Sequence, residues 1–371
     1  MSKLKTEEAI ADAVASAQGP LAIRGGGTRS VGRPVVGEVL DVSGLSGVTL
    51  YEPGALTIVA QAGTPVAEIE ATLAAENQRL AFEPYDLTGL LGTSGASTIG
   101  GVIATNASGP RRIMAGAARD FALGVRFVDG AGRVVKNGGR VMKNVTGYDL
   151  VKLMCGSWGT LGVLTEVSLK VMPSVEAEMT LAIDGLDPSR AVAAMSQALG
   201  SPFEVSGAAW VDGQVWLRLE GFEASVAYRA GMLRSLLSEF GDAAEVNADW
   251  ATVRDAKPLQ QADAVWRVSV KPGDGPAVIA DVPDACETLM DWGGGLLWIG
   301  QTGGGSAATH ERLQAQVAAL GGHATLIKGP EDVRAAVPVF QPEAPGVAAL
   351  TAALRQRFDP QGILNPGLMA A

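Results

Sequence analysis

The sequence predicts an α+β protein of two domains, the second with a mainly antiparallel sheet. At 371 residues, the chain exceeds the length at which one hydrophobic core stops growing. Glycine punctuates its first half, whereas six of the seven tryptophans lie between Trp210 and Trp298. We therefore predict a first domain over residues 1–175, a second over 176–340, and a C-terminal helix and tail over 341–371.

The elements expected in the first domain are short. Thr64 and Pro65 suit the N-cap and first position of a helix that runs to Glu76. An Asp-Gly-Ala-Gly turn joins two strand-like runs and predicts a hairpin. The full set is a helix at 7–16, strands at 21–24, 56–61 and 162–171, and the hairpin 121–128 with 133–136.

The second domain is expected to alternate helices with strands. A turn of Asp212 and Gly213 joins strands at 208–211 and 214–219 into a hairpin. Runs of alternating apolar residues complete a sheet that helices would cover on one side. These runs are strands at 264–270, 296–299 and 323–327 and helices at 223–240 and 308–320, with a last helix at 344–358.

Composition excludes several classes of function. A net charge of −10 and the lack of a basic stripe argue against a nucleic-acid partner. Two cysteines, Cys155 and Cys286, rule out a disulfide framework and an all-cysteine iron–sulfur cluster within the chain, and two histidines make a zinc site improbable. We expect no metal.

The sequence also indicates where the protein works. Glu7, Glu8 and Asp12 interrupt the apolar start, so it lacks the core of a secretory signal. No charge-free run is long enough to span a bilayer. We expect a cytoplasmic protein without a transmembrane segment, held at the inner membrane, if at all, through its partners.

The first candidate site is the turn of residues 24–30, Arg-Gly-Gly-Gly-Thr-Arg-Ser, after a predicted strand. Consecutive glycines allow a positive φ, so successive N–H groups can point into one concavity and bind an anion such as a pyrophosphate. Thr28 and Ser30 add hydroxyl groups, and Arg24 or Arg29 adds charge. Alone, such a turn is more often an ordinary loop.

Two further stretches are rich in small residues. Residues 92–111 combine glycine and hydroxyl side chains with Ile99, Val102 and Ile103, which would form a buried face. A Gly-Thr-Leu-Gly turn at 159–162 runs directly into a strand and is suited to holding a flat ring. Both stretches predict a backbone that approaches a ligand closely.

Taken in order, five motifs resemble the FAD-linked oxidase superfamily, whose FAD-binding domain is of the PCMH type. They are Arg-Gly-Gly-Gly-Thr at 24–28, Thr-Ile-Gly-Gly-x-Ile-Ala-Thr-Asn at 98–106, Thr-Gly-Tyr-Asp-Leu at 146–150, Gly-Thr-Leu-Gly-Val-Leu-Thr-Glu at 159–166, and Phe-Asp-Pro-x-Gly-Ile-Leu-Asn-Pro-Gly at 358–367. The resemblance covers the first 175 residues and the last 15. It implies a two-part FAD-binding domain followed by an α/β cap domain.

The resemblance also implies roles for individual residues. The first loop and residues 98–106 would hold the pyrophosphate of FAD, residues 159–163 would lie along the cofactor, and Asn365 would return from the cap to the FAD domain. The cofactor-binding residues implied are Arg24, Gly25, Gly26, Gly27, Thr28, Arg29, Ser30, Ser97, Thr98, Gly100, Gly101, Thr105, Asn106, Gly109, Thr146, Gly147, Gly159, Thr160, Gly162, Val163 and Asn365.

The FAD is expected to be non-covalent. Superfamily members that tether FAD often use a histidine in the first glycine turn or a cysteine in the second region. Here Thr28 fills the first position, and residues 92–111 contain no cysteine.

Within the superfamily, residues 115–125 and 143–150 resemble the glycolate oxidase branch, and the short middle region fits its E subunit better than its D subunit. The resemblance implies oxidation of glycolate or a related 2-hydroxyacid, with a second FAD subunit and an iron–sulfur subunit as partners. The sequence lacks the His-x-Gly-Asp-Gly-Asn element of the D subunit, and residues 297–303, which stand in the corresponding region, contain no histidine. That absence puts independent catalysis in doubt.

Two other interpretations remain open. Residues 303–308 match a Gly-x-Gly-x-x-Ala dinucleotide fingerprint, which would make the protein an NAD-dependent dehydrogenase. A non-catalytic subunit that carries FAD is the other. Arg267, on a cap strand, is the one candidate substrate contact, although a surface salt bridge is the commoner fate of such a residue. His310 is expected on a solvated helix face, and His323 in a structural role.

Overall fold

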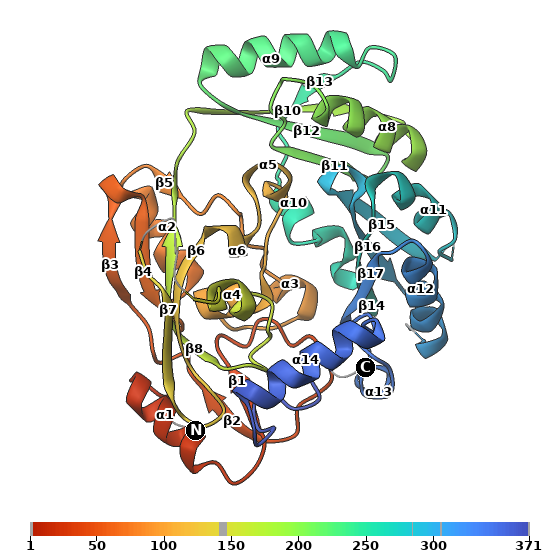
Figure 1. Ribbon diagram of the computed structural model, residues 1–371. Helices are drawn as coiled ribbons and strands as arrows, with labels where there is room; N and C mark the ends of the chain where they lie inside the picture. Colours follow the sequence, from red (N-terminus) through yellow and green to blue (C-terminus); the bar gives the residue numbers. More distant parts are fainter. Residues whose placement is uncertain (1–2, 141–146, 284, 305, 370–371) are drawn as a thin grey trace. The chain divides into compact units, whose positions relative to one another are not determined.

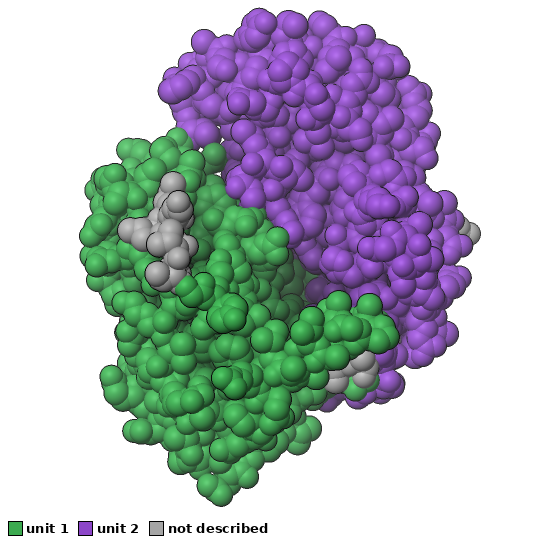
Figure 2. Space-filling view, viewed as in Figure 1, with its two compact units in different colours: residues 1–108, 117–174, 342–371 green, residues 109–116, 175–341 purple. Residues whose placement is uncertain are grey.

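The computed structural model describes residues 3–140, 147–283, 285–304 and 306–369. The chain divides into two compact units, which Figure 2 colours green and purple. Unit 1 comprises residues 1–108, 117–174 and 342–371. Unit 2 comprises residues 109–116 and 175–341.

Unit 1 is built on a five-stranded antiparallel sheet in the order β3-β4-β8-β6-β7 (Figure 1). Two small two-stranded sheets accompany it, β1 parallel to β2 and β5 antiparallel to β9. The strands are β1 (Leu21–Arg24), β2 (Glu38–Asp41), β3 (Val48–Glu52), β4 (Thr57–Gln61), β5 (Gln78–Arg79), β6 (Ala122–Val128), β7 (Val134–Gly138), β8 (Val163–Lys170) and β9 (Met172–Pro173).

The helices of unit 1 are short, and most depend on packing. In α1, Thr6 caps the N-terminus through a hydrogen bond from the Ala9 N–H, and Ile10 and Val14 face the core. The helices are α1 (Glu7–Ser16), α2 (Val66–Ala74), α3 (Thr88–Leu91), α4 (Ile99–Thr105), α6 (Ala118–Phe121), α7 (Leu150–Met154) and α14 (Pro345–Phe358), with the 3₁₀ turn η1 (Pro53–Ala55).

The C-terminal tail completes the core of unit 1. Ile363 and Leu364 are buried in the same cluster as Ile10, Leu21 and Val163. The tail also pairs with β1, because the Leu21 N–H donates to the Ile363 carbonyl at 2.7 Å and the Asn365 N–H donates to the Leu21 carbonyl at 3.0 Å. Residues 342–371 therefore belong structurally to unit 1, although residues 175–341 separate them from it in the sequence.

Unit 2 contains an eight-stranded sheet in the order β13-β10-β12-β11-β15-β16-β14-β17, and each described pair in it is antiparallel. This confirms the α+β class and the antiparallel cap sheet. The strands are β10 (Ala177–Ile183), β11 (Gly207–Val211), β12 (Gln214–Gly221), β13 (Ala244–Val246), β14 (Ala264–Ser269), β15 (Cys286–Asp291), β16 (Leu296–Gln301) and β17 (His323–Lys328).

Helices cover this sheet, with α8 and α9 against its β10–β12 half and α12 against β17 (Figure 1). Asp187 caps α8 by accepting from the Ser189 and Arg190 N–H groups, and Pro188 fills the first helical position. The helices are α5 (Arg112–Ala115), α8 (Pro188–Leu199), α9 (Glu223–Leu236), α10 (Ala251–Arg254), α11 (Gly275–Ala280), α12 (Ala307–Ala319) and α13 (Glu331–Ala336), with 3₁₀ turns η2 (Lys257–Gln261), η3 (Pro272–Asp274) and η4 (Trp292–Gly294).

The start of α2 differs from the sequence expectation. Thr64 does not cap the helix, because its hydroxyl donates to the Gln61 carbonyl at 2.7 Å and accepts from the Gly47 N–H at 2.9 Å. Pro65 takes the cap position, and the helix ends at Ala74, before Glu76. The fully buried Thr64 instead joins two loops. Within the described parts of the chain, no helix is long and apolar enough to cross a membrane.

Candidate functional site

The glycine turn after β1 lies directly against the second glycine-rich stretch. A Cβ added to Gly26 would stand 1.6 Å from the carbonyl oxygen of Ala96, and one added to Gly95 would stand 1.7 Å from the carbonyl oxygen of Gly26. A Cβ on Gly25 would come within 2.7 Å of Thr98 Oγ1. The two backbones can therefore meet only where side chains are absent.

The remaining residues of the turn fix its shape. Gly27 has a φ of +71°, and a Cβ there would meet the Arg24 guanidinium, with Nε at 2.9 Å. Thr28 is buried, whereas Arg24 and Ser30 are exposed. The turn thus exposes the Arg24 side chain at the surface, whereas the Thr28 side chain packs inward.

Arg29 ties the turn to the segments beside it. Its Nη1 donates to Ser97 Oγ at 3.0 Å, and its Nη2 donates to the Tyr85 carbonyl at 2.8 Å. The guanidinium also lies 5.6 Å from the centroid of the Tyr85 ring. Tyr85 was not singled out from the sequence.

Helix α4 forms the next part of the site. Thr98 caps it by accepting from the Gly101 N–H at 3.4 Å, and Thr105 Oγ1 donates to the Gly101 carbonyl at 2.8 Å. The helix ends at Asn106, which has a φ of +50° and accepts from the Arg119 N–H at 3.0 Å. Gly100 faces inward, since a Cβ there would stand 2.7 Å from the Ala62 Cβ.

The third segment, which contains Gly156, Trp158 and the Gly-Thr-Leu-Gly turn at 159–162, contacts the C-terminal end of α4. The Trp158 N–H donates to the Ala104 carbonyl at 2.9 Å, and the Gly156 N–H donates to the Ile103 carbonyl at 3.2 Å. Trp158 has a φ of +53°, an uncommon conformation for a bulky residue and one found where surrounding structure holds the backbone.

Asn365 connects this segment to the glycine turn. Its Oδ1 accepts from the Ile23 N–H at 2.8 Å, and its Nδ2 donates to the Trp158 carbonyl at 2.8 Å. A Cβ on Gly159 would stand 2.8 Å from that Nδ2. The turn after β1, helix α4, residues 156–160 and the tail therefore form one continuous ring of backbone within unit 1.

Three predicted residues of the third segment serve mainly to pack it. Thr160 is buried and donates to the Ser157 carbonyl at 2.7 Å. A Cβ on Gly162 would come within 2.6 Å of the Phe127 ring, and Val163 belongs to the hydrophobic core. Gly162 and Val163 can thus offer a ligand only their backbone.

The structure places the other predicted residues away from this ring or leaves them undescribed. Gly109 belongs to unit 2, where its carbonyl accepts from Trp292 Nε1 at 3.1 Å. Gly147 has a φ of +77° and no atom within 4 Å of an added Cβ among the described residues. Thr146 lies outside the described residues.

One part of the ring has features that suit a bound anion. Around an added Cβ on Gly101, the described neighbours within 4 Å are Thr98 Oγ1 at 3.3 Å, a tight contact with a side-chain oxygen, and Arg29 Nη1 at 3.6 Å, so this backbone position lies beside a cation. Glycine backbone beside a guanidinium is suited to a pyrophosphate.

Cys155 and His310 are not poised for chemistry. Burial raises the pKa of Cys155 to about 12, which keeps the thiol protonated at neutral pH. His310 is fully buried, so the expectation of a solvated face was wrong. It accepts from Trp266 Nε1 at 3.1 Å, its Nε2 meets the Pro338 carbonyl at 2.8 Å, and burial lowers its pKa. No metal-binding group of three such ligands occurs among the residues that the structure describes.

The dinucleotide fingerprint has a different role. Asp263 Oδ2 accepts from the Gly303 and Gly304 N–H groups at 2.8 and 3.1 Å, so a carboxylate of the protein already uses these donors. Strand β14 also lies between β16 and β17 and is antiparallel to both, whereas a dinucleotide fold pairs such strands directly. Neither feature suits NAD.

Arg267 lies on β14 in unit 2, partly buried between two tryptophans. Its Cζ is 5.0 Å from the centroid of the Trp292 ring and 5.9 Å from that of Trp298. Trp292 was missed by the sequence reasoning. The Trp-Gly-Gly-Gly run at 292–295, a bulky residue next to three glycines, is the signal that would have found it.

Comparison with known proteins identifies relatives along most of the chain. Residues 2–138 match the family described as "FAD binding domain". The chain is 36% identical over 355 residues to the glycolate oxidase subunit GlcE of Escherichia coli (strain K12), which covers 95% of this chain and 93% of that protein. A D-lactate dehydrogenase of Archaeoglobus fulgidus is 35% identical over 164 residues, 44% of this chain and 36% of that enzyme.

Two further similarities concern a second glycolate oxidase subunit and the fold. The glycolate oxidase subunit GlcD of Bacillus subtilis (strain 168) is 34% identical over 165 residues, 44% of this chain and 34% of that subunit. A solved alkyldihydroxyacetonephosphate synthase superposes with a TM-score of 0.70 over 97% of this chain and 73% of that one. At 17% identity, this last likeness shows the fold alone.

Proposed function

The chain belongs to the PCMH-type FAD-linked oxidases, a family of flavoprotein oxidoreductases, and from that membership we propose that it is the FAD-bearing E-type subunit of a glycolate oxidase. Its cofactor is FAD. The single observation that best supports the proposal is the 36% sequence identity to GlcE along 95% of the chain. The matches to the GlcD and D-lactate dehydrogenase relatives each cover 44% of this chain.

The ring of unit 1 would hold the cofactor. Gly25, Gly26 and Gly101 would supply backbone close to the pyrophosphate, and the Arg29 guanidinium beside Gly101 would balance its charge. Asn365 would hold the two ends of the ring together. When bound, FAD supplies the two-electron acceptor that oxidation of an alcohol to a carbonyl requires.

The substrate proposed is glycolate or a related 2-hydroxyacid. Its carboxylate would pair with Arg267, because the planar fork of a guanidinium matches two carboxylate oxygens. The Trp292 and Trp298 rings beside Arg267 would favour a flat, weakly hydrated cation there over a lysine.

The electrons would leave through other chains. Cys155 and Cys286 lie in different units, and two thiolates are too few for a four-cysteine cluster. We propose a second FAD subunit and an iron–sulfur subunit as partners, in the cytoplasm or at the inner membrane through those partners.

A non-catalytic FAD subunit is the second candidate. Residues 297–303, which would correspond to the histidine element of the D subunit, begin in β16, in which Leu297, Trp298 and Ile299 are buried core residues. This segment of the chain offers no imidazole to take the hydroxyl proton of the substrate.

One experiment separates these candidates. The purified chain should be yellow, and anaerobic addition of glycolate should bleach the flavin absorbance in the assembled complex. Bleaching of the isolated chain would identify this subunit as catalytic by itself. Bleaching of the complex after its other flavin has been removed would assign catalysis to this chain within the assembly. A colourless chain would contradict the proposal as a whole.

A further inference from the structure

The solvent-facing side of α9 is uncharged over most of its length. Tyr228 is 65% exposed there, and Met232 is 40% exposed. A surface helix ordinarily turns charged residues to water, so an uncharged and partly apolar outer face favours a surface that another protein covers. The exposed residues between Glu223 and Arg234 are Ala224, Ser225, Ala227, Tyr228, Gly231 and Met232.

The opposite side of α9 is fixed to unit 2. Val226, Ala230 and Leu233 are buried on it. The buried Arg229 donates from Nη2 to the Glu220 carbonyl, at the end of β12, at 2.7 Å. One side of the helix thus serves the fold of unit 2, and the other side is left for a partner.

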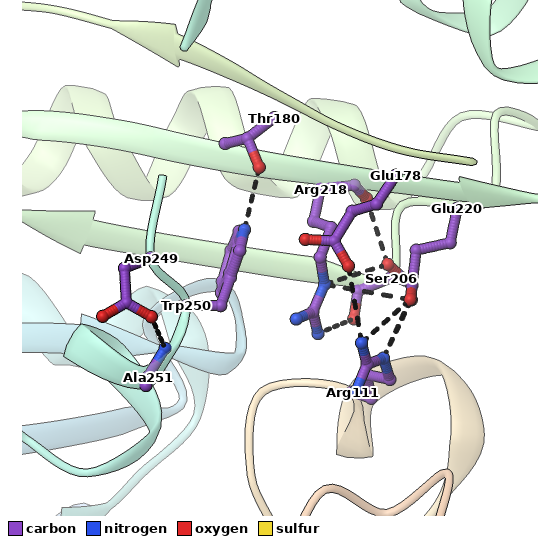
Figure 3. Close-up of polar contacts among 9 residues, drawn as sticks. All are labelled: Arg111, Glu178, Thr180, Ser206, Arg218, Glu220, Asp249, Trp250 and Ala251. Atoms are coloured by element: carbon purple, nitrogen blue, oxygen red, sulfur yellow. Dashed lines mark hydrogen bonds and ion pairs between the residues drawn. The ribbon is translucent and has the colours of Figure 1, made fainter. Parts of the chain in front are cut away.

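The end of β12 that binds Arg229 is itself held by an ion pair. The Glu220 side chain is 6% exposed, and Arg111 Nε lies 3.0 Å from both of its carboxylate oxygens (Figure 3). An ion pair so shielded from water is costly to break. Helix α9 therefore rests on a rigid support, and a partner that binds its outer face need not order it first.

Four of the exposed residues have the spacing of a coiled-coil seam. Ala224, Tyr228, Gly231 and Ser235 stand four, three and four residues apart. Residues with this spacing form one stripe along a helix, because seven residues make about two turns. Tyr228 is the one large residue of the stripe, so a helix that packs on it must place a small residue beside that ring.

An antiparallel pair of α9 helices meets this requirement. A two-fold axis through the middle of the stripe brings Tyr228 of one chain level with Gly231 of the other. The same axis brings Ser235 level with Ala224. In an antiparallel seam, residues at one level lie side by side, so each tyrosine ring gains a neighbour without a side chain. A parallel pair would instead set Tyr228 against Tyr228 and crowd the seam.

The charges at one edge of this face complement each other in the same arrangement. The two-fold axis places Glu223 of one chain about 3 Å, measured along the helix, from the level of Arg234 of the other. Arg234 Nε donates to the Ala243 carbonyl at 3.0 Å, whereas its Nη2 is 4.0 Å from Glu245 Oε2, too far for a hydrogen bond. A carboxylate of a second copy can therefore approach Arg234 more closely than Glu245 does.

We propose that α9 is the interface of a homodimer, in which two copies of this chain pair antiparallel about a two-fold axis. Uncharged contact that includes tyrosine and methionine, with charged residues at the rim, is the usual composition of a protein interface. A single pair of 14-residue helices is smaller than a standard interface, so the dimer is weak, with a Kd of about 1–100 µM. This proposal is independent of the proposed function.

Sedimentation of the FAD-loaded full chain should show a monomer–dimer equilibrium over this concentration range. Gly231→Arg should weaken the dimer at least about 10-fold, because the new side chain meets Tyr228 of the second copy. In its own chain, a Cβ at Gly231 has no described atom within 4 Å, so the monomer accommodates it. Gly346→Arg, at another exposed helical glycine with no described atom within 4 Å, is the matched control and should leave the dimer unchanged.

Several results would overturn the proposal. They are a chain that stays monomeric at every concentration, a dimer that persists in Gly231→Arg, and a dimer that is lost equally in Gly346→Arg. A monomeric chain whose Gly231→Arg variant alone fails to copurify with other subunits would show that α9 binds a different protein, and would exclude the second copy. Thermal unfolding of the same samples confirms that each variant is folded.

Two charge reversals test the antiparallel arrangement. In Glu223→Lys and in Arg234→Glu, like charges meet across the two-fold axis, so each variant alone should dimerise more weakly than the unaltered chain. An equimolar mixture restores both pairs of opposite charges, and its mixed dimer should be at least about 5-fold tighter than either variant dimer at low salt. A mixture that associates no better than its components would refute the antiparallel pairing.

Discussion

Two adjacent glycines of α4 provide the sharpest test of the FAD site. In Gly101→Ala, the new Cβ meets Thr98 Oγ1 at 3.3 Å and Arg29 Nη1 at 3.6 Å among the described residues, so a shift of a few tenths of an ångström in the Thr98 hydroxyl accommodates it. In Gly100→Ala, the Cβ would meet the Ala62 Cβ at 2.7 Å and the Ala62 carbonyl oxygen at 2.8 Å, inside the core. Both substitutions add one methyl group to the helix, and they differ only in the direction in which that methyl group points.

The expected effects therefore separate stability from binding. Alanine in place of a helical glycine stabilises by about 0.5–1 kcal/mol, so apo Gly101→Ala should unfold at the same temperature as the unaltered protein or a few degrees higher. If the open side of Gly101 faces the cofactor, the added methyl overpacks that contact at a cost of about 1–3 kcal/mol. FAD affinity should then fall about 5- to 150-fold.

Gly100→Ala should show the opposite pattern. The clash with Ala62 should lower the stability of the apo protein by about 1–3 kcal/mol. Thermal unfolding of the apo proteins and titration with FAD, followed by flavin fluorescence, measure both quantities. Full FAD affinity in Gly101→Ala would remove α4 from the cofactor site, and a loss of apo stability in that variant would show that the position is packed rather than open.

Three other predictions concern the tail, the flavin linkage and the substrate. Asn365→Ala should destabilise unit 1 by about 2–4 kcal/mol, because it leaves the Ile23 N–H and the Trp158 carbonyl without their hydrogen-bond partner. Asn365→Gly, which tolerates the φ of +44°, separates any backbone strain from the lost hydrogen bonds. Unchanged chemical denaturation of both variants would contradict the bridging role of Asn365. Acid precipitation should release all of the yellow chromophore into the supernatant, because Thr28 offers no side chain that could bond to the flavin and the Cys155 thiol stays protonated below its pKa of about 12. Colour in the pellet would refute non-covalent binding. Arg267→Lys should raise the KM for glycolate with unchanged flavin content, and unaltered kinetics would exclude Arg267 from substrate binding.

The sequence predicted the elements that are stabilised by residues close to them in the chain. Helix α1 has its own capping threonine and an apolar face, and its predicted and observed bounds agree. The glycine turn at 24–30 was identifiable from its three consecutive glycines, which favour a turn by themselves. Such features need no knowledge of distant residues.

The features that the sequence did not reveal depend on long-range contacts. Helix α4 contains two adjacent glycines, which disfavour a helix, and it forms because Thr98 caps it and Gly100 fits against Ala62. Residues 109–116 belong to unit 2, where Arg111 pairs with Glu220 and the Gly109 carbonyl accepts from Trp292 Nε1, and both partners are more than 100 residues away in the sequence. His310 was placed on a solvated face because the residues beside it are charged, whereas Trp266 and the Pro338 carbonyl enclose it.

As proposed, this FAD-linked chain works as one subunit of a larger glycolate oxidase. Turnover of glycolate with an artificial electron acceptor, measured for the purified chain and for the assembly copurified with it, tests that proposal. We expect a copurified assembly, resolved by size exclusion, that contains a second flavoprotein and an iron–sulfur protein and oxidises glycolate, together with an isolated yellow chain that is slow or inactive. A monomer that oxidises glycolate unaided at the full rate of any assembly would contradict the account.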